Sequence, residues 1–213
     1  MDNQMPRVVL LFPNQYAEAA AVLGRAFVND PLLLAIVGGN TDQRDLPRSM
    51  GAVFASVLRD HRAHGQPVWG AIDGDRVVAA AVVEHEARPA SALATALGGL
   101  PAIPALVKAI GWAGLMRGLS ALDTLARNRP PEPHVYLNIL GVEPSMQRRH
   151  LGSAILDYLR DMTAASYSGL VGVYLETATE ANVAYYTRFG YRVIGEIHPL
   201  GARMWRMLQP RSG

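Results

Sequence analysis

The chain has 213 residues, of which 50% are hydrophobic and 18% are charged. This length and composition are typical of one globular domain with a sizeable core, and they exclude a disordered chain. The formal net charge of +2 is too small to indicate nucleic-acid binding. Cysteine is absent, which excludes disulfides, thiolate metal sites and a cysteine nucleophile.

The first quarter of the chain predicts a strand followed by two helices. An apolar run over 7–12 indicates a strand, and Pro13 ends it because proline has no N–H to donate to a ladder. Asn14 is positioned to cap a helix that continues to Phe27. A second helical pattern, with its apolar residues on one face, covers 42–61.

A hairpin and an insertion come next. The segment 73–75, Asp-Gly-Asp, separates apolar runs over 67–72 and 76–84, and a D-G turn between two such runs is a strong hairpin signal. Residues 88–128 are rich in Ala, Leu and Gly and are punctuated by proline, which predicts two helices. We treat the chain as one domain, 1–213, that carries the segment 88–128 as a helical insertion.

The stretch after the insertion predicts a buried strand, a tight turn and a helix. β-Favouring side chains fill 134–142, and Pro144 stops the ladder. From 151 to 162 the apolar residues recur along one helical stripe. The intervening turn, 147–152, places two arginines and a glycine at a helix start, where unpaired N–H groups and the helix dipole favour an anion such as a phosphate. A solvated basic turn is the alternative.

The last part of the chain predicts strands around one short helix. Thr177 or Thr179 can cap a helix over 180–188, and Gly190 ends it as a C-terminal glycine does. Three apolar runs indicate strands, at 171–176, 191–197 and 203–208.

The turn at 147–152 resembles the acetyl-CoA-binding motif of the GNAT superfamily of acyl-CoA-dependent N-acyltransferases, whose pattern is Q/R-x-x-G-x-G/A. Gln147 matches its first position and Gly152 its last, whereas His150 stands where the first glycine is usual. A later register that begins at Arg149 restores the pattern but lies farther from the preceding proline than is usual, so we prefer the first register.

Residues 175–191 resemble the second GNAT signature, in which L-E, N and Y-x-x-x-G-F recur at this spacing. The matching positions are Leu175-Glu176, Asn182 and 186–191. Two signatures in the right order, separated by one helix and one strand, are far more specific than either alone. The resemblance implies an α/β fold: a mixed, strongly twisted sheet of six or seven strands, flanked by helices, with 88–128 as a helical insertion.

The same resemblance implies an acetyl-CoA site. In the family the pantetheine arm pairs with the central strand and the turn binds the pyrophosphate. The expected cofactor-binding residues are Leu140, Gly141 and Val142 on the strand, Gln147, Arg148, Arg149, His150, Leu151, Gly152 and Ser153 at the turn, and Asn182 and Tyr186 on the later helix. Gly141 is expected to leave room for another backbone to approach. Ordinary ladder and helix-surface residues are the alternative.

Tyr186 occupies the family position whose hydroxyl protonates the departing CoA thiolate. The implied chemistry is direct attack of a neutral amine on the thioester, which needs a base for the amine and a proton for the sulfur. Glu176 and Glu84 each end a predicted strand, and burial could raise the pKa of either carboxylate enough for it to accept the amine proton. Solvated strand-end charges and a packed tyrosine are the alternatives. Tyr185 is expected on a different helix face, about 100° away.

We therefore expect an enzyme that transfers an acetyl group from acetyl-CoA, its co-substrate, to a primary amine of a small molecule. A CoA-binding sensor without turnover and a protein N-acetyltransferase are the competing functions. The segment 26–31, A-F-x-x-D-P, resembles antibiotic-modifying members such as puromycin acetyltransferases.

Several partner classes receive no support from the sequence. It contains no metal-binding pattern, no signal-peptide pattern and no apolar run of the roughly 18 residues that a membrane helix needs. We expect a cytoplasmic protein without a nucleic-acid or membrane partner. The insertion is expected to form a wall of the acceptor pocket or a homodimer contact.

Overall fold

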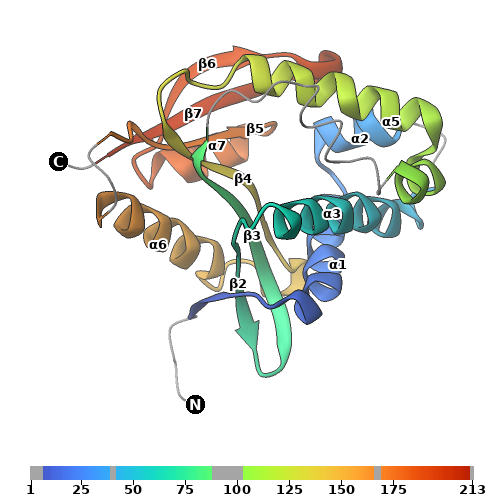
Figure 1. Cartoon of the computed structure of the whole chain (residues 1–213), viewed down its shortest axis with the longest axis horizontal. Coiled ribbons are helices and arrows are strands. Elements are labelled where there is room, and N and C mark those ends of the chain that lie inside the picture. Colours follow the sequence, from blue (N-terminus) through green and yellow to red (C-terminus); the bar gives the residue numbers. More distant parts are fainter. Residues whose placement is uncertain (1–6, 39–41, 88–102, 166–168, 212–213) are drawn as a thin grey trace.

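A seven-stranded mixed sheet is the centre of the computed structural model, which describes residues 7–38, 42–87, 103–165 and 169–211. The strand order is β1-β2-β3-β4-β5-β7-β6 (Figure 1). β4 and β5 run parallel, whereas the other neighbouring strands are antiparallel. The strands are β1 (Val8–Leu10), β2 (Val68–Asp73), β3 (Arg76–Ala87), β4 (His134–Val142), β5 (Gly172–Thr177), β6 (Arg192–Ile197) and β7 (Met204–Pro210).

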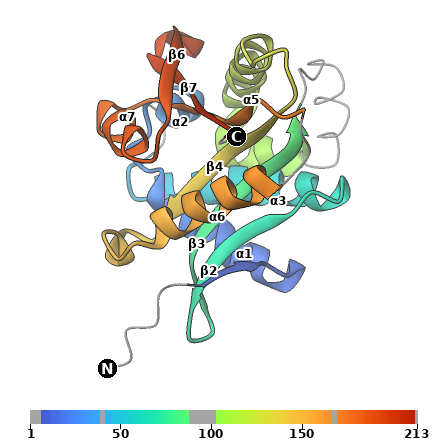
Figure 2. The same cartoon turned by 90° about the vertical axis from the view of Figure 1, so that its left-hand side faces the viewer.

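Helices cover both faces of the sheet. Figure 2 shows α6 in front of β3 and β4, with α1 and α3 behind them. One core cluster lies between the sheet and α6, and a second lies between the sheet and the pair α1 and α3. The helices are α1 (Tyr16–Ala26), α2 (Pro31–Val37), α3 (Leu46–Ala63), α5 (Ile103–Arg127), α6 (Leu151–Ala165) and α7 (Glu180–Thr187). This architecture confirms the predicted fold class.

The start of α1 differs from the prediction. Asn14 does not cap it, because this residue lies inside a one-turn 3-10 helix, η1 (Pro13–Gln15), from which α1 continues directly. The next helix has the stronger cap: Oδ1 of Asp30 accepts the Leu33 N–H at 2.9 Å, and Pro31 follows at the first helical position. The D-P pair of the A-F-x-x-D-P segment therefore serves the start of α2.

Other local signals behave as predicted. The D-G turn joins β2 to β3, with Gly74 at a φ of 59°. Thr179, rather than Thr177, caps α7, since its hydroxyl accepts the Asn182 N–H at 3.3 Å. Gly190 follows that helix with a φ of 83°, a conformation that favours glycine.

The described part of the insertion is α5, and residues 88–102 lie outside the described residues. α5 is broken at Gly111, whose φ of 70° and ψ of 170° are not helical. Its Arg117 donates to the carbonyls of Ile36 at 2.9 Å and Val37 at 3.0 Å, which satisfies the C-terminal end of α2. α5 also contacts α3 and the turn η4 (Pro199–Gly201).

α5 is a long and apolar helix. By length and composition alone this helix could cross a membrane, although no such segment was predicted. The break at Gly111 interrupts it, and Arg117 fixes it to α2. The helix is thus an integral part of this fold.

Candidate active site

The parallel strands β4 and β5 part soon after they begin. They pair at Val135↔Val173 and Tyr136↔Tyr174. Beyond these pairs β4 continues along β3 to Val142, and β5 continues along β7 to Thr177. Within the described chain, the β5-facing backbone groups of the last part of β4 have no strand partner and are open to an extended ligand.

A β-bulge in β4 lies beside this opening. Val82 of β3 pairs with Ile139 and Val83 pairs with Leu137, so Asn138 is the extra residue. The bulge reverses the alternation of side chains. Leu137 packs in the core beneath α6, whereas Ile139 packs in the core beneath α1 and α3.

The three predicted pantetheine-binding residues follow the bulge. Leu140 and Val142 are half-buried and pack against the α6 core. A Cβ on Gly141 would lie 2.6 Å from Cδ2 of Leu23 on α1. Close packing of α1 on β4 therefore also favours glycine at this position.

An ion pair fixes the end of β4 before the turn. Arg25 of α1 donates hydrogen bonds from Nε and Nη2 to the Glu143 carboxylate, and the shortest of them is 2.6 Å. The turn that follows is exposed at Gln147, Arg148, Arg149 and His150. Its Gln147 amide donates to the Val142 carbonyl at 3.4 Å.

The turn has two residues in the left-handed region. Arg148 has a φ of 62° and His150 a φ of 61°. Such conformations cost free energy in a residue with a side chain and are concentrated at ligand clamps. α6 starts directly afterwards with Leu151 buried, and the Ser153 hydroxyl donates to the His150 carbonyl at 2.9 Å. The unpaired amides of this helix start and two exposed arginines form an anion-binding surface.

Tyr185 reaches this helix start, which the sequence did not predict. Its hydroxyl would lie 3.0 Å from a Cβ on Gly152, and burial raises its pKa, although Ser153 is close enough to act in the lowering direction. The rings of Tyr185 and Tyr186 touch at their edges with centroids 5.5 Å apart, although adjacent residues leave a helix about 100° apart.

Tyr186 is buried on the α6 side of the sheet. It is 9% exposed, and its ring packs against Tyr191 at 5.6 Å between centroids. Burial raises its pKa, as does the neighbouring Tyr185, so the hydroxyl keeps its proton at neutral pH. Asn182, the other predicted contact on α7, is exposed, and its backbone N–H is used by the Thr179 cap.

The two predicted base candidates belong to one polar cluster on the face opposite α6. Glu176 accepts a hydrogen bond from the Tyr174 hydroxyl at 2.8 Å, and the Tyr136 phenol is close enough to lower its pKa. Burial raises the pKa of Glu176, while the two phenols and Arg129 act in the opposite direction. Burial raises the pKa of Tyr136 far above its ordinary value, so this phenol remains a donor.

Glu84 enters the cluster from β3. Its carboxylate accepts hydrogen bonds from Nη1 of Arg129 at 3.0 Å and from the side-chain amide of Asn138 at 3.3 Å. The Arg129 guanidinium also lies over the Tyr136 ring, 3.9 Å from its centroid. The cluster thus joins the β4 bulge, β3 and β5 in one network.

Comparisons with known proteins agree with this geometry. Residues 107–193 match the family model described as an acetyltransferase (GNAT) domain. A histone acetyltransferase HPA2 and related acetyltransferase from Corynebacterium glutamicum ATCC 13032 is 22% identical, with a TM-score of 0.70 over 99% of this chain and 98% of that one. The ribosomal-protein-S18-alanine N-acetyltransferase from Escherichia coli is 13% identical, with a TM-score of 0.55 over 98% and 96%.

A third structure, Naa20 from Chaetomium thermophilum in complex with a bisubstrate analogue, is 13% identical, with a TM-score of 0.53 over 96% of this chain and 86% of that one. Residues 107–193 of this chain are thus similar to a GNAT acetyltransferase domain. The match confirms the family suggested by the two sequence signatures. At these identities the solved structures establish the fold of the GNAT domain, and its acceptor is a separate question.

The sequence did not predict that Arg129, Tyr136, Asn138 and Tyr174 belong to this polar cluster. Tyr136 and Tyr174 look like ordinary buried strand residues, and Arg129 lies in a proline-rich approach to β4. Their partnership depends on the register of β4 with β5 and on the path of the loop. The available signal was the alternation of Tyr174 and Glu176, which places both on one face of a strand.

The GNAT domain offers acetyl-CoA a suitable binding surface. The open edge of β4, the left-handed turn and the start of α6 follow one another along one path, from extended backbone to anion-binding amides. Among the described residues, no cluster of three or more His, Asp or Glu side chains could hold a metal ion.

Proposed function

We propose that this protein is an N-acetyltransferase that transfers the acetyl group of acetyl-CoA to a primary amine of a small molecule. The observation that carries the proposal is the opening between β4 and β5, in a sheet that has a carboxylate cluster on one face and the buried Tyr186 side chain on the other. The GNAT domain match supports acetyl transfer as the reaction class.

The proposed reaction is one direct displacement. The neutral amine nitrogen attacks the thioester carbonyl carbon, the C–N bond forms and the C–S bond breaks. The nitrogen's proton goes to the Glu176 carboxylate, and the departing sulfur takes the proton of the Tyr186 hydroxyl. Exchange with solvent then restores both groups.

The environments of the two groups suit these roles. The raised pKa of Glu176 makes it a stronger base than an exposed glutamate, and two phenols hold it in place. Burial raises the pKa of Tyr186, but it also raises that of a thiol formed beside it, so proton transfer between them remains feasible.

The proposal of a small acceptor rests on the cover over the cluster's side of the sheet. Side chains from α2 and α5 pack with residues at the ends of β6 and β7, near Ala178 just after β5. This cover favours a compact amine over an extended polypeptide. A cytoplasmic location is part of the same proposal.

A CoA-release assay against a panel of polyamines, amino acids and aminated antibiotics tests the function. Because the chain has no cysteine, a thiol reagent detects released CoA without background from the protein. We expect turnover with at least one amine, and Glu176→Gln should lower kcat/KM by roughly 10²- to 10⁴-fold.

Calorimetry with acetyl-CoA helps to distinguish the competing functions. The double variant Arg148→Ala, Arg149→Ala should bind about tenfold more weakly or worse, since one charge-assisted hydrogen bond is worth about 1.5–3 kcal/mol and these side chains are exposed. Tight acetyl-CoA binding without CoA release from any amine would instead identify a sensor. Turnover confined to peptides would identify a protein acetyltransferase.

A further inference from the structure

Arg129 comes from the segment that leaves the inserted helix. It lies two residues beyond the end of α5 and five before β4 begins. The neighbouring Asn128 fixes this segment, because its side-chain amide donates to the Thr124 carbonyl at 2.8 Å and its own carbonyl accepts Nη1 of Arg206 at 2.6 Å.

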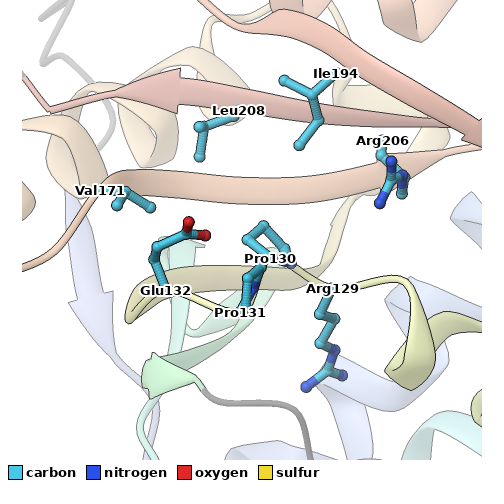
Figure 3. A pocket seen from close by; sticks show the side chains of 8 residues that line it. All are labelled: Arg129, Pro130, Pro131, Glu132, Val171, Ile194, Arg206 and Leu208. Atoms are coloured by element: carbon cyan, nitrogen blue, oxygen red, sulfur yellow. The ribbon is translucent and has the colours of Figure 1, made fainter.

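The Arg129 side chain is almost fully buried, with 11% exposed. It borders a pocket of about 350 Å³ between the proline-rich segment and β7, but Figure 3 shows its guanidinium turned away from the other lining side chains. The guanidinium instead meets the Glu84 carboxylate at 3.0 Å and the Tyr136 ring at 3.9 Å. Both of these partners border Glu176.

We propose that Arg129 is a positioning residue for the reaction: it neutralises Glu84 and holds the Tyr136 phenol on Glu176, so that Glu176 is the carboxylate available to the amine. This inference rests on the proposed function. It assigns a role to the segment that directly follows the insertion, which thereby contributes to the charge of the proposed active site.

The charges of the cluster support these different roles for Glu84 and Glu176. Two carboxylates that share one buried site repel each other, and one of them gains a proton unless a cation intervenes. Arg129 is ion-paired to Glu84 and lowers the pKa of Glu176, whereas Glu84 raises it. The cation therefore keeps Glu176 ionised at a pH where it would otherwise be protonated.

Other charged groups also face the cluster. Arg206 of β7 is the cross-strand neighbour of Glu176, and its guanidinium is engaged by the Asn128 carbonyl. His134 of β4 lies against the Tyr174 ring at 5.3 Å, and burial lowers its pKa, so it contributes no charge at neutral pH. His61 of α3 interacts with Glu84, and burial lowers its pKa too.

The test is a direct titration of Glu176 that needs no amine. Protein labelled with ¹³C at the glutamate carboxyl carbon is titrated by NMR, and Glu176→Gln identifies the resonance. Arg129→Met should move the Glu176 midpoint to higher pH by about one unit or more, the scale of losing a nearby opposite charge. Arg129→Lys keeps the charge and should restore most of the shift.

Two further variants complete the experiment. Arg127→Met removes an exposed arginine paired with Asp123 on the same segment, and it should leave the midpoint in place. Glu84→Gln is nearly isosteric and should move the midpoint to lower pH, so the proposal stays testable if Arg129→Met does not fold.

An unchanged midpoint in Arg129→Met, or in Glu84→Gln, would overturn the role of Arg129. A wild-type Glu176 that titrates in the ordinary glutamate range would overturn a different claim, the base assignment in the proposed function. The two failures are thus distinguishable within one set of spectra.

Discussion

Tyr185 and Tyr186 are adjacent in the chain, yet their hydroxyls lie in different surroundings. The Tyr185 hydroxyl is beside Gly152 and Ser153 at the start of α6. Tyr186 is enclosed by Tyr185 and Tyr191 in the core beneath that helix. A phenylalanine at each position therefore removes a different interaction, and Tyr185→Phe is expected to weaken acetyl-CoA binding before it affects the chemical step.

Tyr186→Phe should reduce kcat by roughly 10²-fold or more, because it removes one positioned proton donor and keeps the ring. Acetyl-CoA affinity should change little, which calorimetry measures. Tyr191→Phe is the matched control: its buried hydroxyl has no hydrogen-bond partner in the described part of the chain, so its loss should leave kcat and stability nearly unchanged. Equal kcat values in wild type and Tyr186→Phe would leave that hydroxyl only a packing role.

His150→Gly should raise thermal stability. Relief of a left-handed side-chain residue is worth about 1–2 kcal/mol, offset by about 0.5–1 kcal/mol of extra backbone entropy in the unfolded chain. The expected rise in Tm is about 1–4 °C for a chain of this size. Gln147→Gly is the control in calorimetric melts, since Gln147 has a φ of −61° and gains nothing from glycine. A loss of Tm in both variants would show that His150 carries no strain.

At the scale of elements, local chemistry predicted most of the fold. The D-G turn, the Thr179 cap and Gly190 each act through neighbours within a few residues, so their effects can be read along the chain. The bulge at Asn138 could not be predicted, because it exists only in the register of β4 with β3. The role of Arg129 could not be predicted for the same reason, because its partners lie on other elements.

The candidate site divides in the same way. The turn and α7 were located correctly in the sequence because their residues are contiguous. The grouping of Glu84 with Glu176 requires three strands and a loop to meet. The packing constraint on Gly141 could not be predicted for a comparable reason: it comes from Leu23 on α1, more than a hundred positions away.

α5 offers a prediction of its own. Leu115 is 6% exposed and Leu119 is 36% exposed, although a spacing of four puts them on one side of the helix. Leu115→Ala should cost about 2–5 kcal/mol, whereas Leu119→Ala should stay within about 0.5 kcal/mol. Denaturant titrations of both variants measure the difference. Equal losses would mean that α5 is buried differently, for instance against a second copy of the chain.

At the scale of the whole molecule, the sheet separates two environments. The turn, α6 and Tyr186 lie on one side, and the carboxylate cluster with α5 lies on the other. Figure 1 shows α5 and α6 far apart, with the strands between them. The opening where β4 and β5 separate lies between these two sides of the sheet.

That parting also constrains the kinetics of a two-substrate reaction. If the acyl donor enters along β4 and the amine enters from the cluster's side, each can bind while the other is present, and both must be bound together for transfer. Initial-rate measurements at several fixed donor concentrations should then give intersecting double-reciprocal lines, the pattern of a ternary complex. Parallel lines would indicate an acetylated enzyme, which would need a nucleophile of its own in a chain that has no cysteine.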